Sequence, residues 1–480
     1  MNFKDQVENI IEEKRDSFIN ISNCIWDFAE TRFEEFESSN LQAEFFEKNG
    51  FSVKKDLADM PTAFVAEYGS GKPVIGFLGE FDALDGLSQA SGEFERRAVK
   101  DDMKGHGCGH HVLGTGSLAA AIAVKDIMEE KGLSGTVRYY GCPGEEGGSG
   151  KVYLSRAGLF NDVDAALSWH PGPENRIWSH NFLSTMSAYF KFEGISSHAG
   201  ASPHLGRSAL DAVELMNVGA NFLREHIIQD ARLHYAITDA GGLSPNVVQA
   251  NASVLYLVRA PKQKQVKDIF DRVIDIAKGA ALMTGTKVEV QFDRASANLL
   301  RNYTLEKLIY KNFEALGPTP INENDIEIAR KYRETFSEGV RSSTDDLLQL
   351  LYGNDAKAIN KKLQDKEILD ELLPYNEKDT LISGSTDTGD VSWHAPLGMS
   401  WITCFAKDTP AHSWQEVAQG KTDLCHKGML HAGKVLAMSG LDLLTNPELL
   451  KDVRNDFEEG LKSESYISLI PADVKPAARR

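Results

Sequence analysis

Hydrophobic and polar residues follow two different periods over residues 1–185, which indicates helices interleaved with strands. Near the start, apolar residues recur at helical spacing over 3–11, and a similar pattern at 38–49 stops at Gly50. Short apolar runs bounded by glycine have the length of buried strands, at 62–68, 74–78, 136–140 and 165–169. Strands that alternate with helices predict a largely parallel sheet with helices on both faces, whose ligands bind beyond the carboxyl ends of the strands.

A change of pattern marks a second unit at residues 186–299. Strict alternation over 186–193 predicts a half-buried strand, and helical spacing at about 207–229 predicts a helix. Strands near 233–239 and 250–260, a second helix carrying Val266 to Ala277 and a last strand around Val290 complete the order β-α-β-β-α-β. That order is typical of a ferredoxin-like insert, so we expect it to interrupt a catalytic domain formed by 1–185 and 300–480.

The last third of the chain is less informative. Residues 318–380 are polar, with runs of Lys and Asp, and are interpreted as a solvated insertion from which no function follows. The end of the chain, Pro471 to Arg480, is expected to be frayed.

Metal-binding chemistry is concentrated in one short segment, His106-Gly-Cys108-Gly-His110-His111. Three imidazoles and a thiol separated by glycines can converge on one ion, and thiolate with imidazole suits zinc and similar metals. A glycine-rich turn with surface histidines is the alternative.

Further candidates follow the predicted strands. Glu145 and Glu146 lie in a glycine-rich turn after one strand, and His170 ends another. Late in the chain, His412 and His394 compete as a loop ligand. Taken singly, each of these candidates has a non-functional explanation: a surface carboxylate pair, a polar strand cap or a loop histidine. Taken together, Cys108, His110, Glu146, His170 and His412 suffice for one ion with an open position or two ions sharing a bridge, leaving Glu145 as a general base for hydrolysis.

Composition narrows the class of protein. The chain has 480 residues, and 52 basic against 70 acidic side chains give a net charge of −18, which argues against a general nucleic-acid binder. No apolar run approaches the ~20 residues of a membrane span, so we expect no membrane partner. Five cysteines without a CxxC pair, and no basic region leading into an apolar stretch at Met1–Gln6, favour free thiols in the cytoplasm.

The motifs together resemble a known family. Gly-Cys-Gly-His after an Asp-bearing strand, Pro-Gly-Glu-Glu-Gly-Gly, a strand-end His and a late His-Ser are similar to the aminoacylase/carboxypeptidase family of metallopeptidases and amidohydrolases. The match is strongest to its p-aminobenzoyl-glutamate hydrolase branch, through segments such as Ser-Pro-His-Leu-Gly-Arg and Ser-Pro-Asn-Val-Val-Gln-Ala. The resemblance implies a phosphorylase/hydrolase-like α/β catalytic domain with a mixed, mostly parallel sheet, interrupted by a lid domain that dimerises.

The resemblance also implies roles for residues. Cys108, His110, Glu146, His170 and His412 become the ligands of one or two Mn²⁺ or Zn²⁺ ions, with Cys108 as the bridge and Glu145 as the catalytic carboxylate. Asp82 becomes a carboxylate that orients a ligand histidine. The sequence departs from relatives at His111, where many have Asp or Asn, and at Glu80, where sister branches have His. His111 is therefore a candidate supporting residue or extra ligand.

Substrate and partners follow by the same analogy. His198 matches a residue that steadies the carbonyl oxygen, often from a partner protomer, and Asn246, Arg259 and Arg207 are candidates for gripping the substrate carboxylate. The implied reaction is hydrolysis of N-acyl or N-aroyl amino acids, with other dipeptides or aminoacylase substrates as alternatives. A homodimer through the lid, a heterodimer with a homologous chain, and a binding protein that lost the chemistry are the alternatives for the assembly and the activity.

Overall fold

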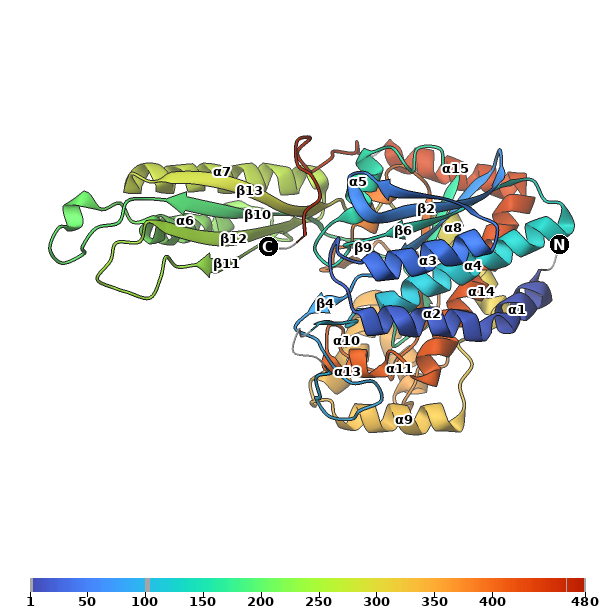
Figure 1. Ribbon diagram of the computed structural model, residues 1–480. Helices are drawn as coiled ribbons and strands as arrows, with labels where there is room; N and C mark the ends of the chain where they lie inside the picture. Colours follow the sequence, from blue (N-terminus) through green and yellow to red (C-terminus); the bar gives the residue numbers. More distant parts are fainter. Residues whose placement is uncertain (1–2, 100–103, 463, 479–480) are drawn as a thin grey trace.

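The computed structural model describes residues 3–99, 104–462 and 464–478. Two bodies lie side by side, a layered α/β body and an elongated smaller body built on its own sheet (Figure 1). The smaller body covers residues 184–296, and the larger body is formed by the chain on both sides of it. An α/β fold with an inserted second sheet is therefore confirmed.

The larger body is organised by a seven-stranded sheet in the order β1-β2-β6-β3-β7-β15-β8. Its central strands β6, β3, β7 and β15 are parallel, and the outer pairs are antiparallel. The strand bounds are β1 Ser52–Leu57, β2 Met60–Ser70, β3 Val74–Glu80, β6 Gly135–Cys142, β7 Ala165–Gly172, β8 Arg176–Ile177 and β15 Leu397–Thr403. The apolar runs that predicted buried strands thus fall on the central strands, apart from the run at 62–68, which is the antiparallel β2.

Two long helices, α4 (His110–Lys131) and α14 (Asp423–Thr445), pack on each other and on this sheet. Around them lie α1 (Lys4–Glu13), α2 (Arg15–Phe28) and α3 (Phe36–Lys48), whose apolar faces join the same core. The remaining helices and short strands of this part are α5 Gly150–Arg156, α8 Tyr303–Leu316, α12 Thr388–Val391, α13 Trp414–Gln419, α15 Pro447–Leu461, β4 Leu84–Asp85, β5 Lys104–Gly105, β9 Asn181–Phe182 and β14 Leu381–Ile382.

The smaller body has the predicted element order β-α-β-β-α-β. Its antiparallel sheet has the order β11-β12-β10-β13, and α6 and α7 pack on it. The bounds are β10 Ser184–Glu193, α6 Ala209–Leu223, β11 Arg232–Asp239, β12 Asn251–Ala260, α7 Gln263–Thr284 and β13 Lys287–Ser296. Helix α6 begins where the Ser208 side chain accepts a hydrogen bond from the Asp211 N–H, two residues later than the sequence pattern predicted.

Residues 318–380 depart from the sequence interpretation. The segment folds into α9 (Glu323–Glu334), α10 (Ser343–Tyr352) and α11 (Ala356–Leu363), rather than a solvated insertion. Its apolar residues are too sparse to show a long period, but they gather into two small cores, one of them around Leu348, Leu351 and Leu363. The polar composition predicted a solvated insertion because these short helices bury few apolar residues each, in small cores of their own.

The end of the chain is also better held than predicted. Val474 packs against an apolar core, and Arg156 donates hydrogen bonds to the carbonyls of Pro471 and Val474. Arg32 donates to the carbonyl of Ala477, so the described part of this segment is anchored between the two bodies. Residues 479–480 lie outside the described residues.

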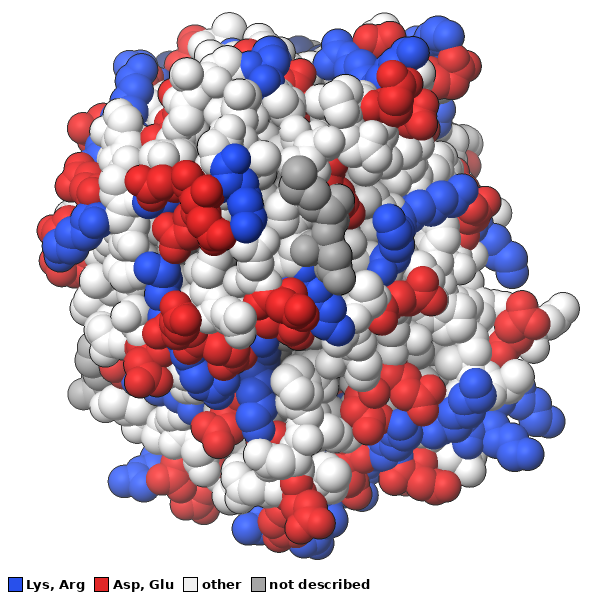
Figure 2. All heavy atoms as spheres, turned by 90° about the vertical axis from the view of Figure 1, so that its right-hand side faces the viewer, with Lys and Arg blue, Asp and Glu red and all other residues white. Residues whose placement is uncertain are grey.

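Charged side chains are mixed on the end of the larger body. Figure 2 shows Lys and Arg interspersed with Asp and Glu over this face, despite the acidic balance of the whole chain. Among the described residues, no helix has the length and apolar character needed to cross a membrane.

Close packing of α4 on the sheet gives a first prediction, at Gly116. A methyl group there would lie 2.7 Å from the Trp169 ring, which is itself fixed by a hydrogen bond to the Leu113 carbonyl. We expect Gly116→Ala to lower the free energy of unfolding by about 1–3 kcal/mol, because overpacking outweighs the better helix propensity of alanine.

The matched control is Gly279→Ala in α7, where a methyl group meets nothing within 4 Å. This change should raise the free energy of unfolding by about 0.5–1 kcal/mol. Urea denaturation measures both, and a Gly116→Ala variant as stable as the wild type would contradict the packing argument.

Candidate metal centre

The candidate site lies at the carboxyl ends of the central strands. Strand β3 ends at Glu80, and Asp82 follows two residues later; β6 ends at Cys142, before the turn that holds Glu145 and Glu146. These strands are parallel neighbours, and β7, which carries His170, pairs with β3 on its other side. Polar residues far apart in the sequence are therefore brought to one edge of the sheet, as the strand pattern predicted.

The start of α4 adds the thiol and an imidazole to this edge. Gly109 has φ +69° and caps the helix, and a methyl group there would lie 2.6 Å from Pro171 Cγ. Glycine is therefore required both by the left-handed backbone and by the close approach to the strand end. Cys108 and His110 flank this glycine, with the Cys108 sulfur next to His170 of β7 and the His110 ring next to Glu80 and Asp82 at the end of β3.

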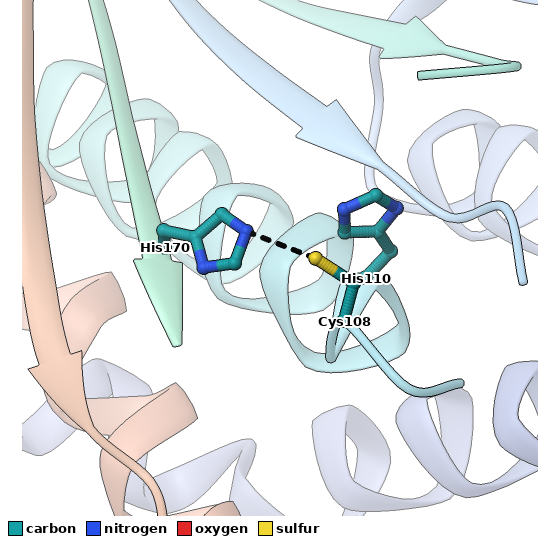
Figure 3. Close-up of side chains that lie close together, drawn as sticks. All are labelled: Cys108, His110 and His170. Atoms are coloured by element: carbon teal, nitrogen blue, oxygen red, sulfur yellow. Dashed lines mark hydrogen bonds between the residues drawn. The ribbon is translucent and has the colours of Figure 1, made fainter. Parts of the chain in front are cut away.

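Cys108, His110 and His170 form a first ligand group, shown in Figure 3. Cys108 Sγ lies 3.4 Å from His170 Nε2, and one donor atom from each of the three residues falls within 4.8 Å of the others. His170 is oriented by a 2.8 Å contact between Nδ1 and the Pro171 carbonyl and by stacking on the Trp401 ring. Its Nε2 is thereby directed to the thiol.

A second ligand group shares the same sulfur. Cys108, Glu146 and His412 also offer donor atoms within 4.8 Å of one another, and Glu146 Oε1 lies 3.3 Å from His412 Nε2. His394, the alternative to His412, lies elsewhere, with Nδ1 3.1 Å from the Asn161 side-chain oxygen. The five sequence-predicted ligands thus form two groups that meet at Cys108.

Asp82 connects the two groups. Its Oδ1 lies 2.9 Å from His110 Nδ1, and its Oδ2 accepts a hydrogen bond from the Glu146 N–H at 2.8 Å. This contact holds His110 with Nε2 facing the other ligands, which is how a carboxylate orients a metal-ligating histidine. Burial by itself lowers the pKa of His110, but Asp82, Glu80 and Glu146 outweigh it and hold that pKa well above its ordinary value.

The pKa values of the two adjacent glutamates, Glu145 and Glu146, are shifted in opposite directions. Burial, together with Glu80 and Glu146, raises the pKa of Glu145 well above its ordinary value. Burial also acts to raise the pKa of Glu146, but the hydrogen bond with His412 and the charge of His110 lower it to about 2. The surroundings therefore favour the anionic form of Glu146, which a metal ligand needs, and the protonated form of Glu145.

The residues present fit a divalent cation. His110 Nε2 and Glu146 Oε1 are buried, and their nearest charged partners, Glu80 Oε2 at 3.2 Å and His412 Nε2 at 3.3 Å, are not placed to form good hydrogen bonds. A poorly satisfied buried polar atom is costly, so a cation that accepts these lone pairs would remove part of that cost. Thiolate and imidazole donors suit zinc, and the carboxylate oxygen is also a donor that manganese accepts.

Sequence reasoning missed a buried cation next to the site. Lys151 is fully buried, with its Nζ 2.6 Å from Glu80 Oε1 and 2.5 Å from Asp387 Oδ1. Glu80 in turn lies 3.2 Å from His110 Nε2 and forms a third group of potential donors with His110 and Glu145. Burial acts to lower the pKa of Lys151, but Asp387 and Glu80 raise it well above its ordinary value. The only sequence signal was its place directly after the glycine-rich turn.

A second missed residue supports the turn that carries Glu145 and Glu146. Glu35 Oε1 accepts a hydrogen bond from the Gly144 N–H at 2.9 Å, and Glu35 Oε2 accepts one from the Thr62 hydroxyl. Burial and the nearby Asp82 raise the pKa of Glu35 to about 8. No motif surrounds Glu35, so nothing in its sequence neighbourhood pointed to this contact.

Several predicted residues lie outside the ligand groups. His111 points away, with Nε2 2.8 Å from the Gly420 carbonyl. His198 and Asn246 are exposed on adjacent loops of the smaller body, joined by a hydrogen bond from the Ala199 N–H to the Asn246 carbonyl. Arg207, near them, donates to the carbonyls of His204 and Gly206. These loops form the end of the smaller body away from the larger sheet (Figure 1).

Arg259 does line a pocket beside the ligands. The pocket, about 250 Å³, is bounded by Glu145, Glu146 and His412 of the larger body and by Arg259 and Arg294 of the smaller one. Arg294 was not singled out from the sequence, because an isolated arginine in a strand carries no pattern.

Comparison with known proteins identifies the family of the chain. The model of peptidase family M20/M25/M40 matches residues 76–376, which include four of the five predicted ligands and Glu145. The chain belongs to this family. Membership of this family of metallohydrolases agrees with the candidate metal ligands at the strand ends and with the inserted second sheet.

Three curated relatives indicate the range of the M20 proteins that it resembles. The chain is 45% identical to one subunit of the p-aminobenzoyl-glutamate hydrolase of Escherichia coli over 98% of both chains. It is 26% identical to the Xaa-Arg dipeptidase of Homo sapiens over 96% of this chain and 93% of that protein. The other subunit of the E. coli hydrolase is 30% identical over 48% of this chain and 55% of its own length.

A solved M20 structure has the same fold. The Bacillus subtilis YXEP protein, described as a dinuclear metal-binding peptidase, matches with a TM-score of 0.54 and 16% identity, over 90% of this chain and 99% of that one. At this identity the match concerns the fold alone.

The buried ion-pair cluster gives the second prediction. Lys151→Met removes the cation and leaves the carboxylates of Glu80 and Asp387 buried without it. We expect the free energy of unfolding to fall by about 3–5 kcal/mol, because an uncompensated buried charge is costly. Denaturant unfolding at neutral pH measures the change.

The control is Lys267→Met, which breaks an exposed pair with Asp271 in α7. It should cost less than about 0.5 kcal/mol. The double change Lys151→Met with Asp387→Leu should recover part of the loss, and a Lys151→Met variant within about 1 kcal/mol of the wild type would contradict the argument.

Proposed function

We propose that the protein is a metal-dependent amidohydrolase that cleaves p-aminobenzoyl-glutamate to p-aminobenzoate and glutamate. The observation that carries the reaction class is the pair of ligand groups sharing Cys108, with Glu145 beside them. The substrate is supported by the 45% identity, over nearly the whole of both chains, to a hydrolase named for it.

Cys108, His110, Glu146, His170 and His412 would hold one or two ions of Mn²⁺ or Zn²⁺, with Cys108 common to both positions. When bound, such an ion supplies Lewis-acid activation of the amide carbonyl and of the attacking water. Asp82 keeps His110 and Glu146 in place for this role, through its contacts with His110 Nδ1 and the Glu146 N–H. His111, bonded to Gly420, would support the start of α4 rather than bind the ion.

Glu145 would move the proton. Its carboxylate accepts the proton of the attacking water and then gives it to the nitrogen of the leaving amino acid. Burial, Glu80 and Glu146 raise the pKa of Glu145, so its carboxylate, once ionised, has a high affinity for that proton. Glu80 and its partner Lys151 thus help to set the proton affinity of the base.

The smaller body would act as a lid and a dimerisation unit, at residues 186–299. His198 and Asn246 are exposed at its far end, and neither lines the pocket beside Glu145. They would therefore serve the site of a second protomer, either another copy of this chain or a homologous protein such as the relative that is 30% identical over 48% of this chain. Arg207 would stabilise the loop that carries them.

A dipeptidase activity is the second candidate, because the Xaa-Arg dipeptidase also matches nearly the full chain. The pocket argues against a basic leaving residue, since Arg259 already lines it. Hydrolysis assays with both substrate types, on chain stripped with chelator and reloaded with Mn²⁺ or Zn²⁺, decide between them. Absence of metal-dependent glutamate release from p-aminobenzoyl-glutamate would refute the proposal.

Glu145→Gln is the third prediction. The amide cannot accept a proton, so kcat should fall by about 10²–10⁴-fold while bound metal per chain stays unchanged. Activity is followed as glutamate release and metal content by elemental analysis. Retained turnover would rule out Glu145 as the base, and loss of metal would mean that it is a ligand.

The fourth prediction concerns the second protomer. His198→Ala and Glu145→Gln should each be nearly inactive alone if the two residues act in one site from different protomers. Mixed and allowed to exchange, they should regain up to about a quarter of wild-type activity per total protomer, because half the dimers are mixed and each mixed dimer has one intact site. No recovery, with exchange verified by mass spectrometry, would place His198 in the site of its own chain or outside catalysis.

A further inference from the structure

His170 belongs to a row of three side chains that crosses three neighbouring strands. Strand register pairs Trp401 of β15 with His170 of β7 on one flank and with Arg176 of β8 on the other. Side chains at paired positions of neighbouring strands project from the same face of a sheet. Trp401 therefore lies between the imidazole of a predicted metal ligand and a guanidinium.

The Trp401 ring contacts both of its neighbours. Its centroid lies 4.6 Å from that of His170, and the planes of the two rings are 16° apart, which is a stacked arrangement. On the other flank, the guanidinium carbon of Arg176 lies 4.7 Å from the Trp401 ring centroid, within the range of a cation–π contact. Arg176 is buried and is itself fixed by a 3.0 Å hydrogen bond from its Nε to Glu174 Oε1. The indole is thus held between a fixed cation and the imidazole.

Gly172 provides the room for this indole. A methyl group built on Gly172 would lie 1.6 Å from Trp401 Nε1, far closer than two unbonded atoms can approach. Gly172 lies in β7, two residues after His170, and its backbone is not in the left-handed region that favours glycine. Space for the Trp401 ring is therefore what glycine supplies at this position.

Trp401 and Trp178 enclose the imidazole at a cost in hydrogen bonding. The Trp178 ring packs against both others, with its centroid 5.0 Å from that of Trp401 and 5.7 Å from that of His170. Both indole nitrogens are buried without an acceptor among the described residues, which costs about 1–3 kcal/mol for each. Three other buried indoles donate to backbone carbonyls, those of Trp26, Trp169 and Trp393. The two tryptophans that forgo this bond are the two that contact His170.

His170 depends on such packing more than His110 does. His110 is oriented by the Asp82 carboxylate, 2.9 Å from its Nδ1. Within the described part of the chain, His170 has no carboxylate partner, and its Nδ1 lies 2.8 Å from the carbonyl of the next residue, Pro171. Since the χ2 torsion of histidine has broad minima, one contact with the adjacent backbone leaves the ring plane poorly fixed. Stacking restrains that plane while Nε2 lies 3.4 Å from the Cys108 sulfur.

We propose that Trp401 is a positioning residue for the metal centre: its indole, held by Arg176, keeps the His170 ring in the plane that directs Nε2 to the shared sulfur, and so sets the metal affinity of the first ligand group. The inference rests on the proposed function, because it concerns the ion which that function requires. Contacts outside the ligands tune metal sites in this way because they fix the ligand before the ion binds. The second ligand group lies outside the stack, so its metal affinity should not depend on Trp401.

The test is a zinc titration against a competing chelator, read as bound Zn²⁺ per chain, on wild type, Trp401→Leu and Trp401→Phe. His170→Ala and His412→Ala each remove a ligand from one group only, and so assign each binding step to its group. We expect Trp401→Leu to weaken the His170 step by about 10–100-fold and to change the other step by less than about threefold. Trp401→Phe keeps a ring that can stack and should stay within about threefold of wild type in both steps. If wild type binds a single ion, the same comparison applies to that step.

Two further variants separate positioning from stability. Gly172→Ala displaces the Trp401 ring without changing a ligand or an aromatic residue, and should reproduce the weakened step. Trp393→Leu is the matched control, because Trp393 is also buried but packs against Tyr466 and should leave both steps unchanged. Equal losses in Trp393→Leu and Trp401→Leu would reveal general destabilisation and overturn the inference. Wild-type affinity in Trp401→Leu, or a Trp401→Phe variant as weak as Trp401→Leu, would also overturn it.

Cobalt provides a readout that lower stability alone does not move. The visible bands of bound Co²⁺ change with the geometry of its ligands, so we expect them to differ between wild type and Trp401→Leu at full occupancy, and identical bands would contradict the inference. These measurements use no substrate. Metal binding that depends on Trp401, without hydrolysis of p-aminobenzoyl-glutamate, would refute the proposed function and keep the inference. Hydrolysis by wild type with normal metal binding in Trp401→Leu would do the reverse, and a wild type that binds neither Zn²⁺ nor Co²⁺ would refute both.

Discussion

Concentrated negative charge around one imidazole is the constraint on which the rest of the site depends. Glu80 and Asp82 both contact His110, and Glu145 and Glu146 lie in the turn beside it. Anions buried this close are tolerated only when cations offset them. Lys151 supplies one positive charge from within the fold and His110 offsets part of the remainder, and a divalent ion at Cys108 would complete the balance.

The position of the charge cluster explains much of the larger body. Parallel strands β3, β6 and β7 must end at one edge for these residues to meet, and α4 must begin at that edge to deliver Cys108 and His110. Glycines at the start of α4 and in the catalytic turn are needed because backbone and ring atoms leave no room for a side chain. The smaller body lines the other side of the pocket with the polar and cationic side chains of Thr185, Arg259, Arg294 and Ser296.

The sequence predicted what is local and periodic. The buried strands, the β-α-β-β-α-β order and the ligand set around Cys108 all rest on short patterns, and the structure brings those ligands together. Lys151, Glu35 and Trp401 could not be found this way, because each acquires its meaning from partners far along the chain. The helices of 318–380 were missed for a related reason, since their small cores form between short segments rather than along one.

The shared sulfur also determines how the metal-free protein withstands oxidants. Burial, with Glu146, Glu416 and Glu145 nearby, raises the pKa of Cys108 well above its ordinary value. Peroxides attack the thiolate rather than the thiol, so the metal-free site holds its sulfur in the form that is slow to become sulfenic acid. The same carboxylates that would attract a cation therefore also favour the thiol form of the sulfur.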